Sequence, residues 1–397
     1  FSFLNYSGWL TNRPNQAGKP LTMFGRYRQL FKRMLGNILH HMQDAFARSD
    51  ALLAFAFTPI MVPFWQTALS FKGNTAKSLN DAARLHIERK GIKPDQPVFS
   101  FINLMGTHMP FHPARHHIER FAPEVLHDKK ARRFLSRFNG DVFGWLSPLS
   151  SPLAKQHKSI LDGMYDAEVA TQDEQLGIFF EKLRASGALN NTLIMVVADH
   201  GEQLGENHLL GHSVSLYHSL THVPLIVRDP AGKLPRGAVI EQPVSTRRVF
   251  HTAVTAAGIA SPTEQMYALS QLGDKDPDQQ TVFAEGHTPQ NVLNLMLKFK
   301  PDLVAAHRVD QPRWAIWHEG YKLIRTGTDQ VELFDYLNDP NETENLADKE
   351  PERVRKMVAL LRDFELDSAE AALTAGRITE QDDPQLRRHL RALGYLE

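Results

Sequence analysis

The sequence has 397 residues, of which 42% are hydrophobic and 23% are charged, as in an ordinary folded globular protein. Lysine and arginine together number 45, which equals the number of aspartates and glutamates, so no net charge draws the chain toward nucleic acid or acidic lipid. The chain has no cysteine, which excludes disulfides, thiolate metal ligands and a cysteine nucleophile within these residues.

The first hundred residues are expected to form helices that lead into a strand. Apolar residues at helical spacing predict helices over residues 26–48 and 77–90. The apolar stretch of residues 51–65 is interrupted by two prolines and is shorter than the ~20 residues that cross a bilayer. We therefore expect a buried or lid-like segment there, without membrane contact. Residues 98–104 predict a strand that runs into a turn carrying His108.

The middle of the chain predicts one helix and one strand of an α/β sheet. Residues 116–152 are polar and irregular, and we expect an insertion or a loop that covers the substrate. Apolar residues from Tyr165 to Leu183 predict a long helix, which Gly187 ends. Residues 192–198 are almost continuously apolar, which is typical of a parallel strand buried on both faces. The predicted fold class is therefore α/β, with a doubly wound, mostly parallel sheet.

Polar residues suited to metal binding or proton transfer follow this strand directly. Asp199 and His200 offer an anionic oxygen and an imidazole nitrogen, and Gly201 lets the backbone turn sharply. Open α/β sheets place their functional sites at the carboxyl ends of strands. The same three residues could instead form a simple Asx turn, and the residues alone leave both interpretations open. His212 follows shortly before another apolar strand, residues 223–227.

The C-terminal part has a different pattern. Apolar and polar residues alternate over residues 313–334, which predicts antiparallel strands, and residues 351–367 predict a terminal helix. We therefore expect an α/β catalytic domain over residues 1–280 and a smaller C-terminal α+β subdomain over residues 281–397.

The ordered succession of these motifs resembles the sulfatase family of the alkaline phosphatase superfamily, from about Ser78 to the end of the chain. The motifs that carry the resemblance are Val196-Val197-Ala198-Asp199-His200-Gly201-Glu202, Gly205-Glu206-Asn207-His208, Leu210-Gly211-His212, His222-Val223-Pro224-Leu225, Gly106-Thr107-His108-Met109-Pro110 and Asp339-Pro340-Asn341-Glu342.

The resemblance implies a metal-dependent sulfuric ester hydrolase. Asp199 and His200 are then expected to hold one divalent metal ion, with calcium favoured and manganese second. His108 is expected to clamp an anionic ester oxygen, and His212 to protonate the leaving group. The expected partner is a small-molecule or saccharide sulfate ester, and not a nucleic acid.

The nucleophile motif of the family has no match in this chain. Family members place metal-binding aspartates and a cysteine, serine or threonine nucleophile near the N-terminus, the nucleophile two residues before proline and four before arginine. The chain has two such Pro-x-Arg triplets, and their nucleophile positions hold Phe111 and Lys349. We therefore expect an N-terminally truncated member, which as written binds metal weakly and does not hydrolyse an activated aryl sulfate.

Two other functions remain open on the sequence alone. Sulfate and phosphate are similar tetrahedral anions that a fold does not separate, so a phosphodiester or phosphonate ester hydrolase, or a phosphoethanolamine transferase, is one alternative. A degenerate, non-catalytic binding protein is the other.

Several neighbouring residues are not assigned to the site. His116 and His117 lie in a polar stretch and are expected to be solvated, and Glu202 is expected to support the site or to face solvent. Ser245 is expected to cap a helix that runs through Ala257, and Arg247 and Arg248 lie at its start, where related sequences usually have an acidic residue.

Overall fold

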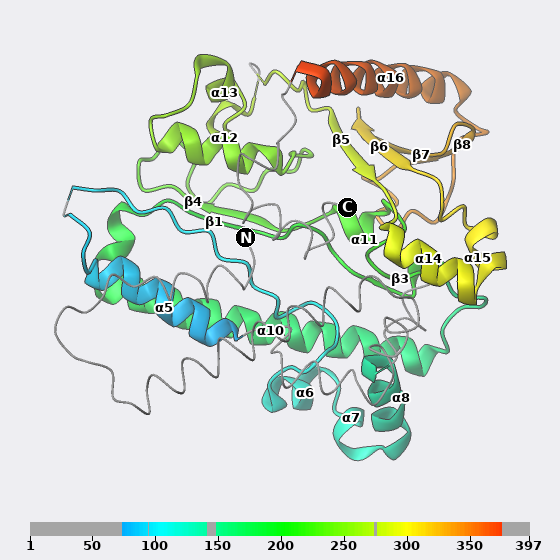
Figure 1. Ribbon diagram of the computed structural model, residues 1–397, viewed down its shortest axis with the longest axis horizontal. Coiled ribbons are helices and arrows are strands. Elements are labelled where there is room, and N and C mark those ends of the chain that lie inside the picture. Colours follow the sequence, from blue (N-terminus) through cyan, green and yellow to red (C-terminus); the bar gives the residue numbers. More distant parts are fainter. Residues whose placement is uncertain (1–73, 94, 141–147, 274–275, 375–397) are drawn as a thin grey trace, which may run out of the picture. The chain divides into compact units, whose positions relative to one another are not determined.

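The computed structural model describes residues 74–93, 95–140, 148–273 and 276–374 (Figure 1). These residues divide into two compact units, which are described separately below. The first unit contains residues 74–93, 95–140 and 154–185, and the second contains 148–153, 186–273 and 276–374. The helix predicted over residues 26–48 and the apolar stretch of residues 51–65 lie outside the described residues. None of the described helices is long and apolar enough to cross a membrane.

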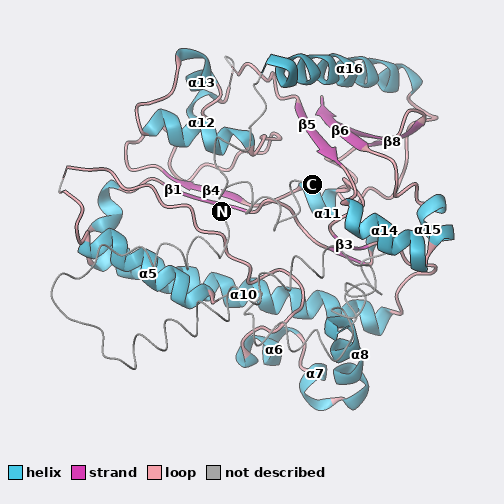
Figure 2. Ribbon diagram, in the orientation of Figure 1, coloured by secondary structure: helices cyan, strands magenta, loops and turns pink. Residues whose placement is uncertain are grey.

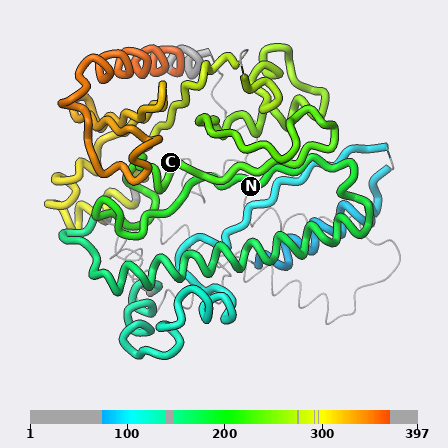
Figure 3. The backbone as a smooth tube through the Cα atoms, turned by 180° about the vertical axis from the view of Figure 1, so that it is seen from behind, coloured from blue at the N-terminus to red at the C-terminus, as the bar shows by residue number. Residues whose placement is uncertain are grey.

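The first unit is built on one long helix, α10 (Lys155–Ala185), against which shorter helices pack (Figures 1 and 3). The helices on α10 are α5 (Thr75–Glu88), α6 (Arg115–Phe121) and α8 (Lys129–Gly140), and α7 (Glu124–His127) packs against α6 and α8. Gly163 of α10 allows the end of α6 to approach closely, because a Cβ at this position would lie 2.2 Å from the carbonyl oxygen of Phe121. The predicted end of the long helix is confirmed, since Gly187 follows it with a left-handed φ of 76°.

Two sequence predictions in this unit differ from the structure. The loop predicted for residues 116–152 is wrong in its first part, which forms α6, α7 and α8. Helical spacing buries Ala131, Phe134 and Phe138 on one face of α8, and this spacing inside a polar segment is the signal that the prediction missed. Residues 98–104 have no strand assignment, although their exposure alternates as in a strand that is covered on one face only.

The second unit contains all eight described strands (Figure 2). β1 (Ile194–Val197) pairs with β4 (Leu225–Arg228), and β2 (Gln203–Leu204) pairs with β3 (Leu210–Gly211). The third sheet has the order β5 (Val282–Gly286), β6 (Arg313–His318), β7 (Tyr321–Thr326) and β8 (Gln330–Phe334). Both predicted strands that flank Asp199 and His212 are confirmed, as are the antiparallel strands of residues 313–334.

Every pairing recorded among the described residues is antiparallel. The doubly wound, mostly parallel sheet therefore stays a prediction. β1 is half-buried rather than buried on both faces, and Ile226 on its partner strand is 64% exposed. The domain boundary predicted between residues 280 and 281 also stays a prediction; β5 begins two residues after it.

Helices cover the sheets of this unit and connect them. They are α11 (His218–Thr221), α12 (Arg247–Ala256), α13 (Pro262–Met266), α14 (Gln290–Phe299), α15 (Pro301–Ala306) and α16 (Pro351–Thr374). The terminal helix predicted over residues 351–367 is thus confirmed and is somewhat longer.

Successive side chains of the four-stranded sheet point to opposite faces, and each face is covered by a different hydrophobic cluster. Ile316 of β6 packs with Met357 and Leu361 of α16 on one face. On the other face, Ala315 and Trp317 pack with Leu216, in the segment that leads to α11. The sheet therefore connects the C-terminal helix with the segment that follows His212.

A buried ion pair joins this sheet to α11. Lys322 of β7 is fully buried, and its Nζ lies 2.5 Å from Oε1 of Glu342, whose other carboxylate oxygen accepts the backbone N–H of His218 at 2.7 Å. The Nζ also donates to the hydroxyl of Thr221 at 3.4 Å. Burial lowers the pKa of Lys322 to about 8, while the charge of Glu342 opposes this shift.

A second buried charge, Arg248, lies in the first turn of α12 and is neutralised by acidic residues. Arg248 is 1% exposed and pairs with Asp276 and with Asp278, whose Oδ2 lies 2.6 Å from Nη2 of the arginine. Arg248 at the start of α12 thus faces two acidic partners.

We expect Lys322→Met to lower the free energy of unfolding by about 3–5 kcal/mol, because it leaves the Glu342 carboxylate buried without its counter-charge. The double variant Lys322→Met/Glu342→Gln should recover much of this loss. Urea unfolding measures both, with Lys349→Met, which removes an exposed ion pair, as the matched control. Equal stability of the two single lysine variants would contradict the role given to the buried pair.

We also expect Arg248→Met to cost about 3–5 kcal/mol, because the buried Asp276 carboxylate would lose its arginine partner, while Asp278 would keep only Arg247. Arg247→Met is the matched control: its half-exposed side chain pairs with Asp278 at the surface, and its loss should cost about 1 kcal/mol or less. Thermal and urea unfolding of the two variants test the difference, and similar losses for both would refute it.

Candidate functional site

Asp199 and His200 lie directly after β1, where the sequence placed them. The backbone N–H of His200 donates to Oδ1 of Asp199 at 3.1 Å, whereas an Asx turn needs the N–H of Gly201, which donates to the carbonyl oxygen of Leu220 instead. Their side chains are accessible, with exposed fractions of 75% for Asp199 and 39% for His200. A loop with this geometry presents both side chains to solvent or to a ligand.

Gly201 is required for a reason other than the sharp turn that we predicted. Its N–H donates to the carbonyl oxygen of Leu220 at 2.8 Å, which binds the loop to α11. A Cβ at this position would lie 2.0 Å from the carbonyl oxygen of Ser219. The close approach of two backbones, and not a left-handed φ, therefore excludes a side chain here.

The β2–β3 hairpin brings His212 beside this loop. The hairpin pairs Gln203 with Gly211, and the same register continued by one residue sets Glu202 opposite His212. Nδ1 of His212 lies 3.1 Å from Oε1 of Glu202, whose side chain is 4% exposed. The ring of His212 stacks on that of His200, with their centroids 4.3 Å apart. Three of the four predicted site residues thus lie together.

The charge of Glu202 determines the protonation of His212. Burial alone lowers the pKa of this histidine, but the hydrogen bond and the negative charge of Glu202, with a further contribution from Asp199, outweigh it and raise the pKa. A buried carboxylate in this position also fixes the orientation of the imidazole ring.

The donors at Asp199 and His200 fit part of the ligand set of a divalent cation. Nδ1 of His200 lies 2.8 Å from the carbonyl oxygen of Gly201, and because a carbonyl only accepts, Nδ1 carries the proton and Nε2 keeps the lone pair that binds a metal. This Nε2 lies 3.9 Å from Oδ1 of Asp199. Among the described residues, no third carboxylate or imidazole joins these two within 4.8 Å.

His108 belongs to the first unit. It lies in the turn after residues 98–104, where its Nδ1 is 2.5 Å from the carbonyl oxygen of Met109. Gly106 packs tightly in the same turn, since a Cβ there would lie 2.3 Å from Oε1 of Gln172 on α10. The approach of His108 to the same site as His212 stays a prediction.

Glu202 is the residue that sequence reasoning undervalued. It was expected to support the site or to face solvent, and the structure shows the first of these. The available sequence signal was the pair of turn-forming residues Gly205 and Asn207, which adopt positive φ values of 120° and 51° in the turn between β2 and β3. Pairing across that turn sets Glu202 opposite His212.

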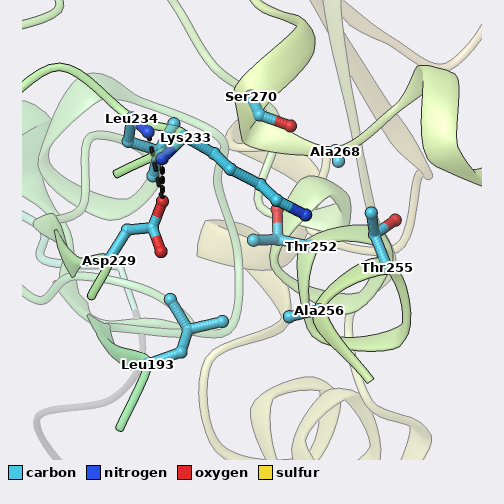
Figure 4. A pocket seen from close by; sticks show the side chains of 9 residues that line it. All are labelled: Leu193, Asp229, Lys233, Leu234, Thr252, Thr255, Ala256, Ala268 and Ser270. Atoms are coloured by element: carbon cyan, nitrogen blue, oxygen red, sulfur yellow. Dashed lines mark hydrogen bonds between the residues drawn. The ribbon is translucent and has the colours of Figure 1, made fainter. Parts of the chain in front are cut away.

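A small pocket in the same unit lies away from this site (Figure 4). Its lining residues are Leu193, Asp229, Lys233, Leu234, Thr252, Thr255, Ala256, Ala268 and Ser270. Leu193 precedes β1 and Asp229 follows β4, so the pocket lies at the opposite end of this strand pair from Asp199. The Asp229 carboxylate is engaged there by the backbone N–H groups of Lys233 and Leu234, at 2.7 and 3.1 Å.

His218 on α11 is expected to stay neutral at mildly acidic pH. Burial, together with the positive charges of His222 and Lys322, lowers its pKa to about 4, whereas the unfolded chain titrates near 6.5. Because the unfolded state binds the proton first, the stability from neutral His218 is present above pH 6.5 and is lost as the pH falls toward 4.

NMR titration of the His218 ring measures this directly, and a midpoint near 6.5 would contradict it. In parallel, the stability difference between the protein and its His218→Phe variant should narrow or reverse between pH 6.5 and 4.

Comparison with known proteins gives the family. The pattern of the family described as Sulfatase matches residues 31–259. Arylsulfatase K of Bos taurus is 25% identical over 288 residues, which are 66% of this chain and 50% of that protein. The uncharacterized sulfatase YidJ of Escherichia coli K12 is 25% identical over 262 residues, 64% of this chain and 48% of that protein. The chain thus spans about half the length of these relatives.

Solved structures support the fold. A phosphonate monoester hydrolase of Agrobacterium radiobacter superposes with a TM-score of 0.52 at 20% identity, covering 73% of this chain and 60% of that one. A protein solved with its substrate D-glucosamine-2-N,6-O-disulfate gives 0.50 at 17% identity, covering 75% and 70%. Both likenesses concern the fold alone, which is alkaline phosphatase-like. Since the Sulfatase pattern covers more than half of its residues, this chain belongs to the sulfatase family.

Proposed function

We propose that this chain carries the metal-binding and proton-donating part of a sulfuric ester hydrolase. The observation that carries the proposal is the arrangement in which His212, held by the buried Glu202, stacks on His200 beside Asp199. A metal donor pair and a histidine of raised pKa within one small cluster suit the cleavage of an anionic ester.

Asp199 and His200 are the residues that we assign to the cation, with calcium favoured and manganese second. A divalent cation there would neutralise charge on the oxygens of the ester. The Nε2 lone pair of His200 and the carboxylate of Asp199 supply two of the donors. Calcium is coordinated by about 6–8 ligand atoms, mostly oxygens, so donors beyond Asp199 and His200 are needed to complete its coordination.

His212 is proposed to donate the proton to the leaving oxygen. Its Nδ1 donates to Glu202, which leaves Nε2 as the atom from which the transferred proton comes. Glu202 is a positioning residue: it orients the ring and favours the protonated form that an acid requires. His108 is proposed to bind a non-bridging oxygen of the ester as imidazolium.

The proposed substrate is a small-molecule or saccharide sulfate ester. Relatives carry the name sulfatase, and one structure of the same fold holds a sulfated glucosamine. A phosphonate monoester is the second candidate, because a hydrolase of that class shares the fold. The doubly wound parallel sheet of that fold is proposed for this chain as well.

The natural protein, isolated as its cell produces it, provides the test of activity. We expect it to hydrolyse 4-nitrophenyl sulfate faster than 4-nitrophenyl phenylphosphonate, and to lose activity when metal is chelated. Asp199→Ala should abolish turnover, and His212→Ala should lower kcat by about 10²–10⁴-fold, the usual contribution of a general acid. His208→Asn, a change of an exposed histidine on the same hairpin, is the matched control.

The 397-residue polypeptide on its own is expected to show no turnover, because neither Pro-x-Arg triplet follows a serine, threonine or cysteine at the nucleophile position. Calorimetric titration with Ca²⁺ or Mn²⁺ should still detect weak binding that Asp199→Ala removes. Turnover that persists in both Asp199→Ala and His212→Ala would refute the proposed site. Preference for the phosphonate ester would favour the second candidate.

A further inference from the structure

A separate group of metal-type side chains lies in the first unit. Nε2 of His116 and Nε2 of His117 lie 3.0 and 3.1 Å from the same carboxylate oxygen, Oε2 of Glu174. One ligand atom from each residue lies within 4.8 Å of the others, and no other group of three such donors occurs among the described residues. This group shares no residue with the site around Asp199.

The fold holds these three donors in place from two helices. Both histidines lie in the first turn of α6, and Glu174 lies in the middle of α10, 58 positions from His116. The approach to α6 is fixed by two bonds between the elements: Ala114 N–H donates to the Thr171 hydroxyl at 3.0 Å, and His112 N–H donates to Oε1 of Glu168 at 2.5 Å.

The end of α6 is fixed in the same way, because Gly163 lets the carbonyl of Phe121 come within a distance that no side chain would permit. α6 therefore stays against α10 through contacts that do not involve the three donors (Figure 1). Such a supported arrangement is what a metal site needs in order to bind without a large ordering cost.

The separations suit a small transition-metal ion. Zinc binds imidazole nitrogen and carboxylate oxygen at about 2.0–2.2 Å, so ligand atoms around it lie about 3.0–3.5 Å apart, as the two nitrogen–oxygen pairs already do. Two neutral imidazoles with one carboxylate favour zinc over calcium, which prefers oxygen ligands. His116 is 60% exposed, which leaves room for water to complete a tetrahedral shell.

We propose that His116, His117 and Glu174 form a zinc site that clips α6 to α10. The site joins a seven-residue helix to the longest helix of the unit, and three protein ligands leave one coordination position for water. The competing arrangement is a hydrogen-bonded group in which the histidines donate to Glu174 without a metal; in that case these hydrogen bonds, together with the charges of the two histidines, lower the pKa of the Glu174 carboxyl.

Calorimetric titration of the metal-free chain with Zn²⁺ tests the proposal. His117→Ala and Glu174→Gln should each weaken one Zn²⁺ site by more than about 100-fold, beyond the 10–100-fold typical of losing an outer-shell partner. His127→Ala, which removes an exposed histidine of the same unit outside the group, is the matched control and should bind like the unchanged chain. Asp199→Ala should keep this zinc site, which separates it from the proposed catalytic cation.

Co²⁺ substitution provides a second readout that does not depend on activity. Visible d–d absorption typical of low coordination should appear in the unchanged chain and in His127→Ala, and should be absent in Glu174→Gln. Zn²⁺ should also raise the Tm of the unchanged chain but not of Glu174→Gln, while both have the same Tm in chelator. Equal zinc affinity in the unchanged chain, His117→Ala and Glu174→Gln would overturn the proposal in favour of the hydrogen-bonded group.

Discussion

The buried pair of Lys322 and Glu342 is the interaction on which the second unit depends most. Lys322 places an ammonium group among the apolar side chains of the four-stranded sheet, which is costly unless the charge is paired. Glu342 supplies the pair and uses its second oxygen to accept the N–H of His218 at the start of α11. One carboxylate thereby fixes a strand and a helix that lie far apart in the sequence.

The same helix then holds the loop of the candidate site. Leu220 of α11 accepts the N–H of Gly201, and the close contact with Ser219 leaves no space for a side chain on that glycine. Asp199 and His200, the two residues before Gly201, are therefore held through α11 by the C-terminal sheet. This chain of contacts gives the C-terminal part a physical role in the site, although none of its residues is proposed to touch the substrate.

Much of the second unit could be predicted from its sequence because local patterns and tertiary contacts agree there. The alternation of apolar and polar residues over 313–334 correctly predicted strands there, and the apolar run before Asp199 correctly predicted β1. The antiparallel pairing of β1 with β4 was not deduced, because the apolar run was taken as a parallel strand and a short run does not by itself fix the direction of its neighbour. Glu202 was undervalued because its role depends on a hairpin register that brings it opposite His212.

The first unit was harder to predict because its signals are short. α8 carries its apolar face within a segment rich in lysine and arginine, so overall polarity concealed the helical spacing of Phe134 and Phe138. His116 and His117 were expected to be solvated, and nothing local indicates that a glutamate 58 residues away meets both rings. The spacing of apolar residues within a helix predicts which face is buried, but it does not predict which residue of a distant helix that face will contact.

The central claim is that Asp199 and His200 bind the cation beside which His212 acts. Anomalous diffraction from crystals grown with Mn²⁺ and a slowly hydrolysed aryl sulfate tests it most directly. We predict a manganese peak within bonding distance of the Asp199 carboxylate and His200 Nε2, with the ester oxygen within hydrogen-bond reach of His212. Crystals with the ester bound beside His212 but no manganese within bonding distance of Asp199 or His200 would contradict the account.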